Sequence, residues 1–169
     1  PSNSSAASDV YKRQISSFDR KDRNMTTSSF WNFISAAEDE YSVYRKRIMA
    51  KFSLSAAETD IIMFLANNPG YDTAADISKV RRILKSQVSV SVKSLCEKGL
   101  LTGTYKDGNK KSVHLSLTAK AKPVVTYGKK EQSDFAAVLF DGFTDEEIAA
   151  FERYHIKILD NINRKRSDK

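Results

Sequence analysis

Apolar residues recur at spacings of three and four over residues 28–50, with charged residues mostly on the other side. This spacing places the apolar side chains on one face of a helix, because an α-helix turns once every 3.6 residues. The pattern therefore predicts a long amphipathic helix over 28–50. Its apolar stripe consists of Phe30, Phe33, Ile34, Ala37, Tyr41, Tyr44 and Ile48.

Two shorter helices are predicted next. Ser55 and Glu58 have the spacing of a capping box and precede the apolar run IIMFL, and the sequence Asn68-Pro69-Gly70 ends that helix. Thr73 is the expected N-cap of a third helix that ends near Val80. We expect its core contacts to be Ala74, Ile77 and Val80.

The stretch SQVSVSVKSLCEKG, residues 86–99, alternates like a strand but also fits a helix. As a helix it brings Val88, Val92 and Leu95 onto one face, with Ser86 as N-cap and Gly99 just past the end. A strand would align the valines but would leave Leu95 unexplained. We therefore predict a helix over 86–98.

Val90 lies about 200° from Val88 on this helix, since each residue advances about 100°. It is then an exposed apolar side chain among polar and basic neighbours, next to Gln87 and Lys93. A tolerated surface valine is common. The functional alternative is contact with a thymine methyl group in a major groove.

After Gly99, the segments LLTGTY and SVHLSL predict two strands joined by KDGNKK. Asp107-Gly108 suits a tight turn, and Val113, Leu115 and Leu117 should share the inward face. Two helices then follow. One is predicted over about 118–139, and the other begins with the capping box TDEE at residues 144–147.

The first 24 residues are polar and lack helical periodicity. We interpret 1–24 as a disordered, artefactual leader, with a native disordered tail as the alternative, and expect one domain over 25–169. The longest uncharged run, residues 24–37, is too short and polar to span a membrane. One cysteine, Cys96, excludes an internal disulfide and fits a reducing, cytoplasmic compartment.

Charge is distributed unevenly along the chain. Residues 73–130 contain 13 lysines and arginines against three acids, a formal charge of +10. Residues 131–163 contain eight acids against two bases, a formal charge of −6. The basic segment predicts a region that faces a polyanion, whereas the alternative is an ordinary solvated surface.

The order of these elements resembles the MarR family of bacterial transcriptional regulators. The resemblance is carried by LSAAETDIIMFLANNPG, TAADISKV, KSQVSVSVKSLCEKGLL and the LSLT that closes the hairpin. It implies a mainly α fold with a small β-wing. In that fold a winged helix-turn-helix covers 53–118, and dimerisation helices cover 28–50 and 119–164.

The resemblance also implies a homodimer that binds double-stranded DNA at a pseudo-palindromic operator, as a repressor controlled by a small aromatic effector. Four residues that could line an effector cleft, or belong to the core, are Tyr41, Tyr44, Phe64 and His155. The sequence departs from the family in the wing. Where the family commonly has an Asp-x-Arg element, this chain has Asn109, Lys110 and Lys111, which are less suited to bidentate contacts.

In this interpretation the N-terminal end of helix 86–98 enters the major groove. Gln87 is the expected base reader, with adenine as partner, and Val90 contacts a methyl group. Ser86, Ser89 and Lys93 divide between bases and phosphates. Phosphate contacts come from Lys79, Arg81, Arg82 and Lys85, and the wing contacts come from Asn109, Lys110 and Lys111.

Three other functions fit the sequence less well. A thiol redox sensor would depend on Cys96, which we place near the inward face of its helix, where a thiol is inert. An enzyme is not expected, because His114 and His155 lie on different elements and no catalytic, cofactor or metal-binding motif is present. A winged helix that binds protein, or DNA without sequence preference, is the main alternative.

Overall fold

The computed structural model describes residues 27–106 and 109–167, without the side chains of Thr27, Lys106, residues 109–111 and residues 165–167. The expected leader, 1–24, and the expected turn at Asp107-Gly108 lie outside these ranges. The chain divides into two compact units, 1–38 and 39–169, and each is described by itself. Helix α2 (Thr27–Phe52) contributes its first part to one unit and its second part to the other.

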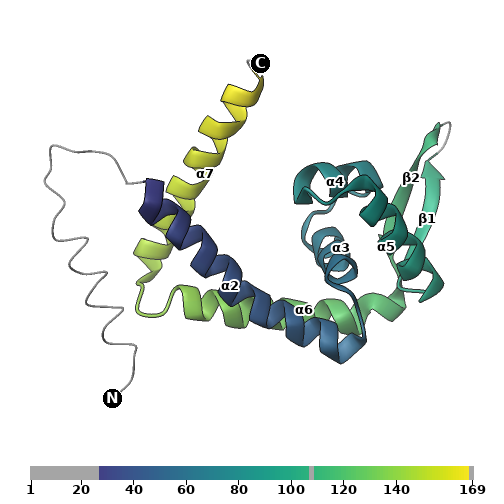
Figure 1. Cartoon of the computed structure of the whole chain (residues 1–169), viewed down its shortest axis with the longest axis horizontal. Coiled ribbons are helices and arrows are strands. Elements are labelled where there is room, and N and C mark those ends of the chain that lie inside the picture. The colour runs from purple at the N-terminus through teal and green to yellow at the C-terminus, as the bar shows by residue number, and fades with distance from the viewer. Residues whose placement is uncertain (1–26, 107–108, 168–169) are drawn as a thin grey trace, which may run out of the picture. The chain divides into compact units, whose positions relative to one another are not determined.

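The second unit is mainly helical with one small antiparallel hairpin, as the sequence predicts. Figure 1 shows α3, α4, α5 and the β1–β2 hairpin grouped together, with α6 leading away to α7. The elements in chain order are α3 (Ala56–Asn67), α4 (Ala74–Arg81), α5 (Lys85–Glu97), β1 (Leu101–Lys106), β2 (Asn109–Leu117), the 3₁₀ turn η1 (Ala119–Ala121), α6 (Lys122–Leu139) and α7 (Asp145–Ser167).

Three helices begin at predicted N-terminal residues, two of them at predicted capping boxes and α4 at its predicted N-cap, Thr73. At α3 the Ser55 hydroxyl accepts from the Glu58 backbone N–H at 3.2 Å, and the Glu58 carboxylate accepts from the Ser55 N–H at 2.7 Å. Thr73 forms the same reciprocal pair at α4, and Thr144 forms it at α7. These pairs satisfy N–H groups that a helix start leaves without a partner.

The ambiguous stretch 86–99 is a helix, but its predicted N-cap is wrong. Helix α5 begins at Lys85 after Leu84, which makes no side-chain cap, and Ser86 lies within the first turn. The reason is the preceding connection, in which Arg82 adopts a left-handed conformation with φ of 54° and ψ of 32°. The Ser78 hydroxyl donates to the Ile83 carbonyl at 2.8 Å and holds this turn.

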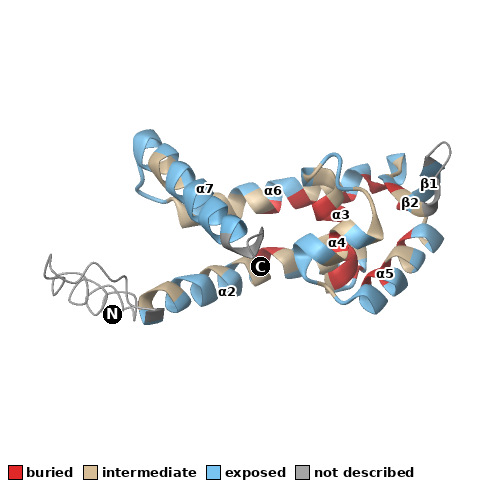
Figure 2. Cartoon of the chain, turned by 90° about the horizontal axis from the view of Figure 1, so that it is seen from above, coloured by how far each residue is buried: buried red, intermediate tan, exposed pale blue. Residues whose placement is uncertain are grey.

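The core lies between the three short helices, the hairpin and the start of α6. Figure 2 shows the buried positions concentrated there. Val80, which we expected in the core, is 49% exposed. Helix α4 has only eight residues, and Ile77 fills its fully buried position, which leaves Val80 outside in the last turn. The largest side chains with less than 2% exposure are Ile48, Thr59, Ile61, Ile62, Ile77, Val88 and Leu95.

The hairpin is half-buried only near its base. Leu101 pairs with Leu117 and Tyr105 pairs with Val113, and a register shift follows Tyr105. Leu115 is buried, but Val113 is 40% exposed, so the predicted inward face is incomplete. This part of the hairpin extends past the core residues that cover Leu115.

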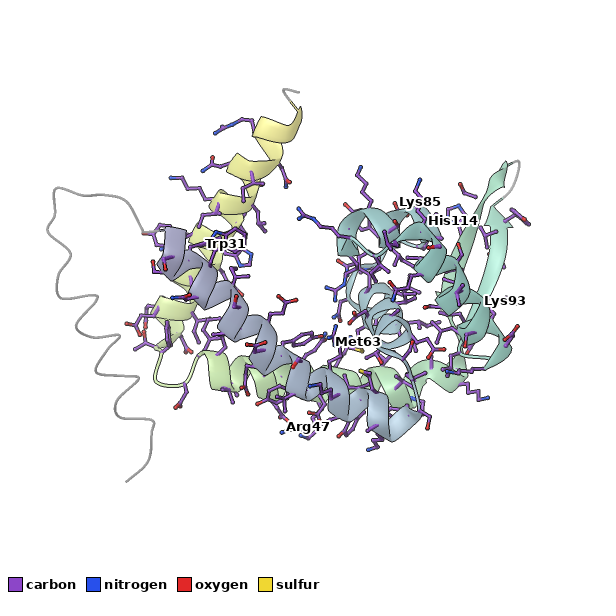
Figure 3. All side chains as sticks on the ribbon, in the orientation of Figure 1. Trp31, Arg47, Met63, Lys85, Lys93 and His114 are labelled. Atoms are coloured by element: carbon purple, nitrogen blue, oxygen red, sulfur yellow. The ribbon has the colours of Figure 1, made fainter. Side chains whose placement is uncertain are left out.

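Within the second unit, the last part of α2 packs against α6. Tyr41 and Tyr44 contact the Phe135 ring edge-on, with centroids 5.3 and 5.8 Å away. Arg47, which Figure 3 labels, forms an ion pair with Glu131, with Nη1 3.2 Å from Oε2. Tyr44 and Ile48 are buried, so the predicted apolar stripe is a packing face in this part of the helix.

Candidate nucleic-acid interface

Helix α5 has one buried face and one wide exposed face. Val88, Ser91 and Leu95 are buried against α3 and α4. Val90 is 71% exposed, which confirms that this valine points away from the core. Figure 3 labels Lys85 at the start of this helix. The predicted contact residues exposed on α5 are Lys85, Ser86, Gln87, Ser89, Val90 and Lys93.

Two of these side chains have partners within α5. The Ser89 hydroxyl donates to the Lys85 carbonyl at 3.0 Å, so its oxygen lone pairs remain available to accept a hydrogen bond. Lys93 lies 3.9 Å from Glu97, and both side chains are largely exposed. An exposed i,i+4 pair of this kind contributes little, so Lys93 can exchange Glu97 for a phosphate at low cost.

The predicted contacts on and after α4 differ in their surroundings. Lys79 and Arg82 are exposed, and Arg82 adopts the left-handed conformation between α4 and α5. Arg81 instead reaches back to α3, where its guanidinium lies 3.5 Å from Asp60. Lys79 and Arg82 therefore lie on the exposed face of the α4–α5 pair, whereas the Arg81 side chain is directed toward Asp60 on α3.

The predicted wing contacts are described only by their backbone. Asn109, Lys110 and Lys111 belong to strand β2 rather than to a loop. Their side chains lie outside the described residues. Lys106, the last residue of β1, pairs with Asn109 across the hairpin.

The basic segment 73–130 does not form one surface. Its last four bases, Lys120, Lys122, Lys129 and Lys130, lie on η1 and α6 rather than on α4, α5 or the hairpin. Lys122 and Lys130 line a separate open hollow of about 640 Å³ with Phe52. The charge count along the sequence therefore overstates the charge beside α5.

A buried carboxylate supports α5 from behind, and the sequence did not reveal it. Glu58 is 4% exposed and accepts from the Ser94 hydroxyl and the Lys98 ammonium, both at 2.7 Å. Burial raises the pKa of Glu58, but hydrogen bonds from Lys98, the Ser55 backbone and Ser94 outweigh this effect and lower it to about 2. The capping box predicted one role for Glu58, whereas its second role depends on contacts 36 and 40 residues away.

The hairpin is attached to the loop before α4 by His114. Its Nδ1 lies 2.6 Å from the Asp72 carboxylate, and the Leu115 N–H donates to the Asp72 carbonyl at 2.7 Å. Residues Thr73 and His114 also form an isolated antiparallel bridge. His114 thus fixes the hairpin relative to the start of α4.

Comparison with known proteins agrees with this arrangement. A family model described as the MarR family matches residues 52–108. A MarR transcriptional regulator from Methanosarcina mazei has a TM-score of 0.69 at 17% identity, covering 82% of this chain and 99% of its own. A MarR-family regulator from Listeria monocytogenes, in complex with 26-mer DNA, has a TM-score of 0.69 at 21% identity, covering 79% and 87%. No curated protein sequence matches the chain.

The chain has the winged-helix fold of the MarR-family regulators to which it is similar. In this family's terms, α4 and α5 form the helix-turn-helix and the β1–β2 hairpin forms the wing. The matched range, 52–108, covers α3 through β1 and the two residues between β1 and β2. The surrounding helices are supported by the structural comparisons, which extend over about four fifths of the chain.

The environment of Cys96 in this MarR-family fold differs from our prediction. The thiol is exposed, because the inward position of this turn is occupied by the neighbouring Leu95. Burial therefore does not make Cys96 inert. It is the only cysteine in the chain, so no second thiol of the same chain can form a disulfide with it.

The residues considered for an effector cleft separate into two groups. Tyr44 and Phe64 are buried, with 6% and 4% exposure, and Tyr41 packs on Phe135, as ordinary core residues do. His155 is exposed on α7 and contacts Phe151. Among the described residues, His, Cys, Asp and Glu form no group of three that could hold a metal ion. In the same part of the chain, no helix is long and apolar enough to cross a membrane.

Proposed function

We propose that this protein is a regulator of the MarR family that binds double-stranded DNA sequence-specifically and controls transcription. The observation that carries the proposal is the exposed, polar and basic first half of α5, held by a winged helix-turn-helix. A helix-turn-helix protein places this end of its second helix against base edges in the major groove. The complex of the Listeria monocytogenes relative with DNA supports the same use of the fold.

In this proposal Gln87 reads a base, with adenine as its bidentate partner, and Val90 packs against a thymine methyl group. Ser86, Ser89 and Lys93 flank these two contacts. Lys79, Arg82 and Lys85 neutralise phosphates beside the groove. Asn109, Lys110 and Lys111 approach the neighbouring minor groove from the wing.

We further propose that the protein acts as a homodimer on a pseudo-palindromic operator. Helix α7 carries several exposed apolar side chains, which the described residues of the same chain leave largely uncovered. Such a face marks an interaction surface when its members are contiguous. They are Tyr154, Ile156, Ile158, Leu159 and Ile162, with exposures from 44% to 62%.

Residues 28–50 and 119–164 are the proposed dimerisation segments. In the part of α2 that precedes Asp39, Trp31 is 58% exposed and contacts Phe30 edge-on. Large exposed aromatic side chains are enriched at protein interfaces. Repression, its relief by a small aromatic effector and a cytoplasmic bacterial setting complete the proposal, and they depend on the family relationship alone.

The deciding experiment is a selection from random duplex DNA with residues 25–169 at near-physiological salt. The proposal predicts enrichment of a pseudo-palindrome whose half-sites lie about one helical turn apart. If about three phosphates per chain are neutralised, a dimer should show a log–log salt slope of roughly −5. Absence of enrichment would favour a winged helix that binds protein, or DNA without sequence preference.

A further inference from the structure

Three helices of the second unit meet at the carboxylate of Asp60 on α3. Arg45 of α2 donates to one oxygen, with Nη1 3.2 Å from Oδ2. Arg81, the last residue of α4, approaches the other oxygen, with Nη2 3.5 Å from Oδ1. Each carboxylate oxygen therefore has its own guanidinium.

The carboxylate is more buried than either arginine. The Asp60 side chain is 14% exposed, whereas those of Arg45 and Arg81 are 32% and 41% exposed. Moving Arg81 to a DNA phosphate would remove one of the two cations from this partly buried carboxylate. Such a loss is costly, because little water is available to replace the missing partner.

The neighbouring arginine has no such attachment. Arg82 is exposed and, among the described residues, forms no ion pair. It lies in the left-handed turn that joins α4 to α5, directly before the first turn of the exposed face. Arg82 can therefore approach a phosphate without breaking an existing contact, whereas Arg81 cannot.

We propose that Arg81 is a positioning residue rather than a phosphate ligand, and that it acts through Asp60. By holding the end of α4 on α3, the pair fixes the turn from which α5 starts. Through Arg45, the same carboxylate ties this turn to α2. This inference rests on the proposed DNA-binding function and assigns Arg81 a different role within it.

The salt dependence of DNA binding distinguishes the two roles. A residue that neutralises a phosphate contributes about 0.9 to the log–log salt slope, because it displaces condensed counterions. Loss of a positioning residue weakens DNA binding without changing that slope. Arg81→Gln and Arg82→Gln remove the same charge from adjacent positions and are therefore matched variants.

The experiment measures binding of the full chain to the selected duplex over a range of salt concentrations. We expect Arg82→Gln to make the slope shallower by about 2 for a dimer, one phosphate per chain. Arg81→Gln should leave the slope unchanged and weaken binding about 5- to 10-fold. Asp60→Asn should reproduce the effect of Arg81→Gln. The double variant Asp60→Asn/Arg81→Gln should bind DNA no more weakly than either single variant, because both substitutions break the same ion pair.

The proposal would be overturned if Arg81→Gln made the salt slope shallower by as much as Arg82→Gln does. Unchanged affinity in a folded Asp60→Asn variant would also overturn it. Should Asp60→Asn fail to fold, the Arg81→Gln slope decides alone, since that side chain is partly exposed. If the wild-type chain instead shows no salt-dependent binding to DNA, the proposed function itself is refuted.

Discussion

The carboxylate of Glu58 and the ammonium of Lys98 lie 2.7 Å apart and join the first turn of α3 to the residue that ends α5. The same Glu58 oxygen accepts from Ser94, one turn earlier on α5. The proposed reading helix is therefore attached to its neighbour by a buried charge. This attachment has a measurable dependence on pH.

The pKa of Glu58 is lowered in the folded protein from an ordinary 4.5 to about 2. Stability from a lowered carboxyl pKa is present above the unfolded value and is lost as pH falls through the folded value. We expect the wild type to lose ~3 kcal/mol of unfolding free energy from this group between those pH values. Glu58→Gln should remove that component of the pH dependence and should be less stable at neutral pH.

Urea unfolding as a function of pH measures this effect. Glu152→Gln removes an exposed carboxylate on α7 and is the matched control, which should keep the wild-type profile. If the unfolding free energy of Glu58→Gln varies with pH in parallel with that of the wild type, the Glu58–Lys98 pair does not stabilise the fold as its geometry indicates.

Gly128 on α6 is expected to tolerate no side chain. A Cβ there would overlap the Met63 sulfur on α3 and lie 2.9 Å from its methyl group, and both residues are buried. Gly128→Ala should therefore lower the unfolding free energy by about 1 kcal/mol, because overpacking outweighs the better helix propensity of alanine. The double variant Gly128→Ala/Met63→Ala should lose less than the sum of its single variants, as measured by thermal unfolding. Strict additivity would contradict the proposed clash.

Substitutions on α5 should separate base reading from phosphate binding. Gln87→Ala should cost about 1–3 kcal/mol of discrimination and relax the preference at one position of the selected site. Lys85→Gln should weaken binding to all sequences and reduce the salt slope by about 1 per chain. Lys129→Gln on α6 is the control for charge and should change neither quantity. An unchanged site preference in Gln87→Ala would remove this residue from the proposed interface.

The exposed row on α7 should control dimer formation. Ile158→Gln, at a side chain with 47% exposure, should shift the chain from dimer to monomer in analytical ultracentrifugation. Because the residue is exposed in one chain, the monomer should keep its helical content. Lys157→Gln, at the adjacent exposed position, should leave the dimer intact. Equal dimerisation of both variants would exclude this face as the interface.

Cys96 should react with maleimide in the native protein at a rate within about tenfold of that of the denatured chain. The prediction follows from the exposure of the thiol on α5. The redox-sensor alternative is tested by oxidising Cys96 with one equivalent of peroxide and measuring the affinity for DNA before and after. Unchanged affinity after complete oxidation would exclude it, and much slower native labelling would contradict the exposure.

Local signals in the sequence were sufficient to predict the helices and the starts of α3, α4 and α7. Ser55, Thr73 and Thr144 each have an acidic partner three residues later, and all three capping boxes form. Such contacts depend on neighbours within one turn, so spacing alone predicts them. The burial of Val88 and the exposure of Val90 followed from helical periodicity for the same reason.

The tertiary structure decided which polar side chains face one another. Glu58 and Lys98 are 40 residues apart, Asp72 and His114 are 42 apart, and Arg45 and Asp60 lie on successive helices. No periodicity encodes such pairs, because they depend on how the helices cross. Packing also decided the exposure of Val80 and Cys96. Ile77 occupies the buried position of α4 and Leu95 that of the last turn of α5, which leaves Val80 and Cys96 exposed. The sequence by itself determined the elements and which side of α5 is exposed, whereas packing determined what holds that proposed reading face in place.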